Sequence, residues 1–233
     1  MKKLLSMCVC MMCLWSLCAQ RRTETTAEEA YLSTSSELLV GILAEQPDIE
    51  SKLDALEEAA NIIDTGHASD NIRKTLEALA GEGTMVESRL NGRLINNYFE
   101  VRLRACELLG KIHTPQAKEA LKQVLAADSE PSIMASAVRS IGAIGINDAN
   151  DDAVIAITEA VKKNNNAGNA DSNLAAAALE SLEKLFSKIE RPENRKAVLE
   201  SIAEISVNWK YNVDVRTRAK ELHKKLQRNI PGA

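Results

Sequence analysis

The amino-acid sequence predicts an all-α superhelix, a solenoid in which helical hairpins stack in series. Three observations predict this fold: a short apolar template that recurs, a chain break after each copy, and a composition poor in aromatic residues. Hydrophobic residues make up 45% of the 233 residues, whereas aromatic residues make up only 3%. A core of small and aliphatic side chains suits closely packed helices. The 27% of charged residues excludes a multi-spanning membrane protein.

The charge balance limits the class of partner. The chain has 29 lysine and arginine residues against 33 aspartate and glutamate residues, and its formal net charge is −4. Nucleic-acid-binding domains usually carry a strong basic excess. The composition therefore argues against a nucleic-acid partner.

The repeated template is clearest in two segments, 101–108 and 215–222, which share Val, Arg, Arg, Ala, Glu and Leu at matching places. Apolar or small residues at positions i, i+4, i+7, i+8 and i+11 lie on one face of an α-helix. Copies of this template start at residues 52, 101, 133, 174 and 215. Each copy predicts the first helix of a repeat.

Each of the first four copies is followed by a break and a second apolar-striped segment. The breaks lie at 65–67, 112–115, 147–152 and 191–192, where turn-forming residues, among them proline and glycine, end one helix. The sequence thus predicts about four hairpins over residues 48–228 and a closing helix over Asp214–Gln227. Residues 20–47 form an N-terminal segment whose leading helix, about 28–45, covers the first hairpin with a polar outer face. Residues 229–233 form a tail.

One motif carries a family resemblance: Val-Arg-x-x-Ala-x-x-x-Leu-Gly, in Val101, Arg102, Ala105, Leu109 and Gly110. It resembles HEAT repeats of the armadillo-type fold, especially the HEAT-like repeats of phycobilisome lyases, and the resemblance covers residues 48–228. The resemblance implies a scaffold, an adaptor or, in a few members, an enzyme. Segments 132–134 and 173–175 lack the arginine that follows the first apolar residue, so the arginine ladder that the resemblance implies is not expected there.

Two insertions interrupt the repeats. The pair Asn91-Gly92 lies between short apolar arms and predicts a small β-hairpin over about 85–96, because both turn residues must adopt positive φ. An extended loop without strands is the alternative. Residues 162–172 are rich in asparagine and predict a mobile loop.

The first nineteen residues have the pattern of a secretory signal peptide. Lys2 and Lys3 precede an apolar stretch over 4–15, and cleavage is expected between Ala19 and Gln20. We therefore expect a bacterial protein exported to the periplasm or cell envelope. An uncleaved anchor is the alternative. Cys18 lies in a lipobox-like segment, so a lipid anchor on this residue is a further alternative and the only membrane contact expected.

Two constellations suggest chemistry but have simpler explanations. Residues 148–159 nearly match a calcium loop, but Ala153 stands where that loop needs glycine, and Asp151 or Asp152 serves equally well as a helix N-cap. Cys106 and His113 could form a nucleophile and base, but a lone cysteine on an apolar helix is usually a core residue. His67, His113 and His223 are too scattered for a metal site. The sequence predicts no catalytic residue, metal or cofactor.

Basic residues on the second helices predict a partner-binding groove. They are Lys118, Lys122, Lys162, Lys163, Arg195 and Lys196. A solvated face of mixed charge is the alternative, because acidic residues lie among them. Trp209 and Tyr211 either anchor a partner or cap the final helix.

These observations favour an exported, non-enzymatic scaffold that binds a protein or peptide of the cell envelope on the concave face of the solenoid. An enzyme or accessory lyase-like protein and a purely structural envelope protein are the alternatives.

Overall fold

The computed structural model describes residues 27–66, 68–148 and 150–228. The chain divides into two compact units, Met1–Ser35 and Ser36–Ala233. Within the first unit, the described residues form the beginning of α2 (Ala27–Glu45). The expected signal peptide, with Cys18, Ala19 and Gln20, and the tail over 229–233 lie outside the described residues.

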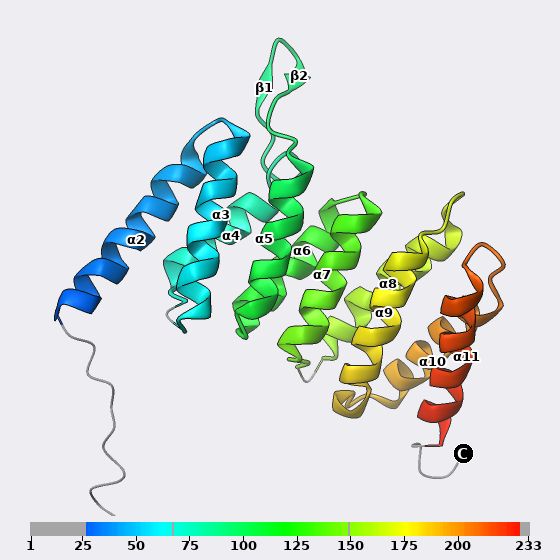
Figure 1. Cartoon of the computed structure of the whole chain (residues 1–233). Coiled ribbons are helices and arrows are strands. Elements are labelled where there is room, and N and C mark those ends of the chain that lie inside the picture. Colours follow the sequence, from blue (N-terminus) through cyan, green and yellow to red (C-terminus); the bar gives the residue numbers. More distant parts are fainter. Residues whose placement is uncertain (1–26, 67, 149, 229–233) are drawn as a thin grey trace, which may run out of the picture. The chain divides into compact units, whose positions relative to one another are not determined.

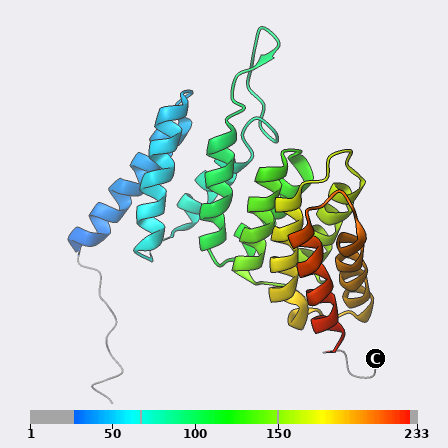
Figure 2. The same ribbon diagram turned by 45° about the vertical axis from the view of Figure 1, so that its right-hand side comes forward.

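The second unit is a series of stacked helical hairpins (Figure 1). The hairpins are α3 (Ile49–Asp64) with α4 (Asp70–Ala80), α5 (Phe99–Lys111) with α6 (Pro115–Ala127), α7 (Pro131–Ile144) with α8 (Asp152–Asn166), and α9 (Ser172–Leu185) with α10 (Pro192–Val207). A short 3-10 turn, Phe186–Lys188, extends α9, and α11 (Val213–Gln227) closes the series. The first helices, α3, α5, α7, α9 and α11, contact one another in order, and the second helices, α4, α6, α8 and α10, form the other layer (Figure 2). The predicted all-α superhelix and its closing helix are confirmed.

The sequence breaks end and restart the helices by capping. The side chains of Asp48, Ser69, Thr114, Asp171 and Asn212 each accept a hydrogen bond from the backbone N–H three residues ahead. Proline stands at the start of α6, α7 and α10, where a missing N–H costs nothing. The hairpin boundaries therefore follow from local chemistry.

Small residues of the template let neighbouring first helices approach closely. A Cβ added to Gly110 of α5 would lie 2.6 Å from Ser140 Oγ of α7, and one added to Gly142 of α7 would collide with Ser181 of α9. Ser181 Oγ also donates to the carbonyl of Val138 at 2.9 Å. The glycine at the end of the motif therefore marks places where two helix backbones approach very closely.

The predicted β-hairpin is confirmed between α4 and α5. Its strands, β1 (Arg89–Leu90) and β2 (Arg93–Leu94), pair in antiparallel fashion. Asn91 and Gly92 adopt φ values of 51° and 79°, as a tight two-residue turn requires.

The mobile loop predicted over 162–172 is wrong for residues 162–166, which belong to α8, whereas residues 167–171 do connect two helices. Helix α8 continues to Asn166, and the buried side chain of Asn164 then fixes the short connection that follows. Asn164 Oδ1 accepts from the backbone N–H of Asp171 and Nδ2 donates to its carbonyl, both at 2.8 Å. The side chain of Asn164 thus makes the two hydrogen bonds that the Asp171 backbone would otherwise make with another backbone segment.

The leading helix is present as α2, but over residues 34–45 its surface includes exposed large apolar side chains, whereas a polar outer face was expected. In the second unit, Val40 is fully buried, and Leu43 packs against the core. Leu38 and Ile42 nevertheless remain 66% and 50% exposed. Across the described part of the chain, no helix combines the length and apolar character needed to cross a bilayer.

Candidate functional site

Two hollows lie side by side along the second helices, and we call the surface around them the second-helix face. The first, of about 190 Å³, lies between α6 and α8 and includes Leu125, Ala156 and Ala160 in its lining. The second, of about 430 Å³, lies between α8 and α10. Glu159 lines both hollows, so they form one continuous surface.

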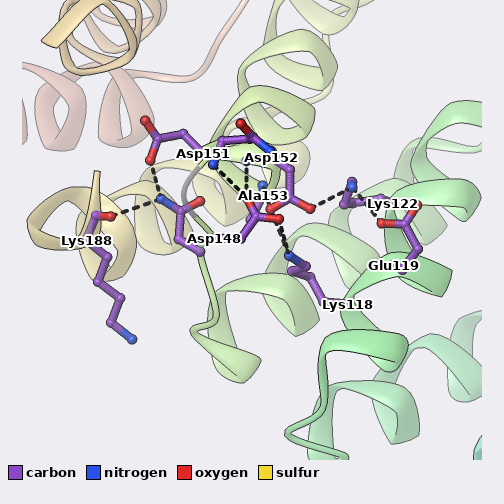
Figure 3. Close-up of polar contacts among 10 residues, drawn as sticks. Lys118, Glu119, Lys122, Asp148, Asp151, Asp152, Ala153 and Lys188 are labelled. Atoms are coloured by element: carbon purple, nitrogen blue, oxygen red, sulfur yellow. Dashed lines mark hydrogen bonds and ion pairs between the residues drawn. The ribbon is translucent and has the colours of Figure 1, made fainter. Parts of the chain in front are cut away.

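Two of the predicted basic residues belong to an ion-pair cluster, although Lys122 also lines the first hollow. Lys118 Nζ lies 2.8 Å from one carboxylate oxygen of Asp152, and Lys122 Nζ lies 2.7 Å from the other (Figure 3). Lys122 also contacts Glu119 at 2.7 Å, while Lys118 lies 3.5 Å from Asp148. Lys118 is only 4% exposed and has almost no surface to offer a partner.

The lysines keep Asp152 ionised. Burial opposes the charge, but the hydrogen bonds from Lys118 and Lys122 prevail and lower the pKa of Asp152 to about 2. Burial likewise opposes the charge of Lys122, whose pKa is nevertheless raised by Asp152 and Glu119. The cluster therefore neutralises itself and joins α6 to the start of α8.

Asp151 occupies the N-cap position of α8, as one of the two predicted assignments has it, but its side chain does not cap the helix. Its backbone φ is 57°. The fully buried carboxylate instead accepts from the backbone N–H groups of Glu190 and Arg191 at 3.0 Å, and from the side-chain amides of Asn147 at 2.7 Å and Asn194 at 2.9 Å. These bonds lower the pKa of Asp151 although burial opposes ionisation. Asp151 thus fixes the chain entering α10.

The same contacts explain the calcium-like pattern over 148–159 without a metal. Lysine ammonium groups contact Asp152, and amide groups contact Asp151. Within the ranges that the structure describes, no group of three or more histidine, cysteine, aspartate or glutamate side chains is arranged to hold an ion.

The other four predicted basic residues lie closer to solvent. Lys162 is exposed and lines the second hollow, and Lys163 lines the first. Arg195 donates to the carbonyl of Ile189 at 2.6 and 3.1 Å, and Lys196 lies 3.7 Å from Glu200 in an exposed pair. Acidic side chains share this surface: Glu159, Glu200 and Glu204 line the second hollow. The second-helix face therefore carries mixed charge.

Tyr211 and Trp209 have opposite environments in one loop. Tyr211 is 2% exposed, its hydroxyl accepts from Asn164 Nδ2 at 3.1 Å, and burial followed by the charge of Asp171 raises its pKa to about 12. Lys210 Nζ donates to the carbonyl of Ala167 at 2.7 Å. These contacts hold the loop, on which Trp209 is 80% exposed. Tyr211 therefore positions the loop, and Trp209 is presented to solvent.

Cys106 is a core residue. Its side chain is fully buried on α5, and burial, with a smaller effect of Asp128, raises the pKa of the thiol to about 12. A thiol with this pKa stays protonated at neutral pH, whereas a nucleophilic cysteine acts as its thiolate.

A buried ion pair that the sequence analysis did not predict joins the beginning of α5 to the end of α6. Arg102 Nε lies 2.9 Å from Asp128 Oδ2, and the two side chains are 5% and 2% exposed. Arg102 also donates to the Glu82 carbonyl at 3.4 Å and to Asn97. The motif arginine was a signal for a polar contact, but nothing marked Asp128 as its partner. The matching arginine of α11, Arg216, has a buried Nε without a partner, so no arginine ladder continues there.

Stacked hairpins and a long, mixed-charge face define a helical-repeat protein of the α-solenoid class. Residues 93–171 match the family model for HEAT repeats. This match supports the HEAT-repeat family predicted from the sequence, and the same hairpin architecture continues on both sides of it. HEAT-repeat proteins are generally non-catalytic scaffolds, often used for protein interaction. Comparison with curated proteins gives no match.

Proposed function

We propose that this protein is an exported, non-enzymatic scaffold whose second-helix face binds a protein or peptide of the cell envelope. The observation that carries the proposal is the pair of adjoining hollows over α6, α8 and α10, which share Glu159. Stacked repeats present extended surfaces that grip a partner at several points without a deep pocket. The signal-like segment over 1–19 supports the export part of the proposal.

The charges on this face define the partner segment further. Asp152 and Glu119 together balance the charges of Lys118 and Lys122, so these lysines add little attraction for an anion. In the second hollow three acidic residues, Glu159, Glu200 and Glu204, outnumber Lys162. A partner segment with a basic side chain over α8 and α10 and apolar side chains over α6 and α8 complements the face.

Site-specific photo-crosslinking in intact cells tests this function. A photo-reactive amino acid is placed at Thr158, which lines the second hollow, and in the control at Thr217, an exposed residue of α11 in the other layer. We expect one predominant protein adduct from position 158, none from position 217, and loss of the adduct when Glu200 and Glu204 are both replaced by lysine. The same adducts from both positions would contradict a defined binding face.

A further inference from the structure

The β-hairpin between α4 and α5 interrupts the repeat pattern and carries an unusual share of exposed apolar residues. The exposed large hydrophobic residues in and beside it are Met85, Val86, Leu90, Ile95 and Phe99. Val86 and Leu90 are 61% and 62% exposed, among the highest values for large hydrophobic residues in the part of the chain that the structure describes. Exposed apolar residues gathered on one small element commonly mark an interaction site.

The base of the hairpin is fixed by hydrogen bonds. The buried Asn96 accepts from the Ser88 N–H at 2.9 Å and donates to the Val86 carbonyl at 2.8 Å. The Gly83 N–H donates to the same Val86 carbonyl at 2.9 Å, and Arg102 holds the flanking Asn97. The apolar side chains are therefore presented from an ordered base, which lowers the conformational entropy lost on binding.

The two surfaces of the hairpin differ in charge. Arg89 is neutralised by Glu87 at 2.8 Å. Leu90 and Arg93 are cross-strand partners, and Ile95 follows Arg93 on the same surface because side chains alternate along a strand. Arg93 makes no ion pair with any residue that the structure describes. This surface therefore combines two exposed apolar side chains with one unpaired cation.

The outer edge of β2 is open for a further strand. Ile95 N–H donates to the Ser88 carbonyl, and Leu94 lies between this pair and the cross-strand pair of Leu90 and Arg93. In an antiparallel ladder a residue between two hydrogen-bonded pairs directs its own N–H and carbonyl away from the partner strand, so those of Leu94 point outward. The sheet has only two strands in the described part of the chain, and nothing pairs with this edge.

We propose that the hairpin is a second docking site, where an extended segment of a partner protein adds a strand to the edge of β2. Backbone hydrogen bonds to Leu94 supply affinity, as in other cases of strand addition. The segment carries a carboxylate that pairs with Arg93 and an apolar side chain that packs on Ile95. A second copy of this chain fits less well, because a symmetric pairing through Leu94 places each Arg93 opposite Ile95 of the other copy and supplies no carboxylate for it.

Selection from a random-peptide phage library on the full chain tests the proposal. We expect enriched peptides that alternate apolar residues with at least one aspartate or glutamate and that lack proline. A synthetic peptide of the selected sequence should bind Arg93→Glu and Leu94→Pro about tenfold more weakly than the unchanged protein, with Arg93→Lys intermediate. Circular dichroism should show unchanged helix content, since both residues lie outside the helical core.

Controls separate this site from the second-helix face and from other occupants. Glu200→Lys should leave the peptide affinity unchanged. The proposal would be overturned if the selection enriched no peptide with an aspartate or glutamate. It would also be overturned if the selected peptide bound Arg93→Glu and Leu94→Pro as tightly as the unchanged protein, even if the second-helix face binds its partner. Binding to vesicles of equimolar phosphatidylcholine and phosphatidylglycerol that is lost in Arg93→Glu would overturn it in favour of a lipid surface. A dimer that Leu94→Pro dissociates would overturn it in favour of a second copy.

Discussion

Replacing Asp128 by alanine is expected to destabilise the repeat array by about 3–5 kcal/mol, because it leaves a buried guanidinium without its carboxylate. The Arg102 and Asp128 side chains are only 5% and 2% exposed, and their charged atoms lie 2.9 Å apart. Asp128 also accepts from the Glu130 N–H at 2.8 Å, a bond that the variant loses. Arg102 keeps Asn97 and the Glu82 carbonyl as acceptors, which places the expected loss near the lower end of this range.

Urea unfolding followed by circular dichroism measures the loss. The matched control is Asp64→Ala, which breaks the Lys111–Asp64 pair at a similar distance, 2.8 Å, with side chains 49% and 63% exposed. That exposed pair should contribute only about 0–1 kcal/mol. Replacing both buried residues, as Arg102→Met with Asp128→Leu, should cost less than Asp128→Ala alone. Equal losses for Asp128→Ala and Asp64→Ala would refute the reasoning, because burial is what separates the two pairs.

Three further predictions concern packing, pH and export. Gly110→Ala should destabilise the protein by about 1–3 kcal/mol in urea unfolding, because the methyl group meets α7, whereas Gly168→Ala, in open space, should not. Because the pKa of Asp152 is lowered to about 2, the ionised carboxylate stabilises the folded protein by about 1 kcal/mol after solvent screening. This stabilisation is present above pH 4 and is lost as the pH falls to about 2. The difference in urea midpoint between the unchanged protein and Asp152→Asn should therefore disappear over that pH range. N-terminal sequencing of envelope material should begin near Gln20; an intact Met1 would contradict export, and a diacylated Cys18 would select the lipoprotein alternative.

The sequence was sufficient to predict the helices because their signals are local. The spacing of Val101, Ala105 and Leu109 marks one helix face, and all three residues are fully buried. The Asn91-Gly92 turn likewise depends on the φ preferences of two adjacent residues. Signals contained within one helix or turn can be read without knowing what packs against it.

The polar contacts of the second-helix face could not be predicted in the same way. Lys118 and Asp152 are 34 positions apart, and their pairing depends on how α6 and α8 pack. Without that geometry, Asp152 resembled a calcium ligand and Lys118 a partner contact. The sequence places Asn164 in a mobile loop for the same reason, since its bonds to Asp171 depend on where α8 ends. Long-range polar pairing carries no periodic signal in the sequence.

The most direct test of the central claim is the affinity of the partner captured at position 158 for variants of the second-helix face. Isothermal titration calorimetry compares the unchanged protein with the double variant Glu200→Lys and Glu204→Lys. The matched control replaces Glu107 and Glu221 by lysine. Both residues are exposed, on α5 and α11, and lie outside both hollows. We predict that the double variant binds at least about tenfold more weakly while the control binds unchanged. Equal affinities for all three proteins, or an equal loss in both variants, would contradict binding at the second-helix face.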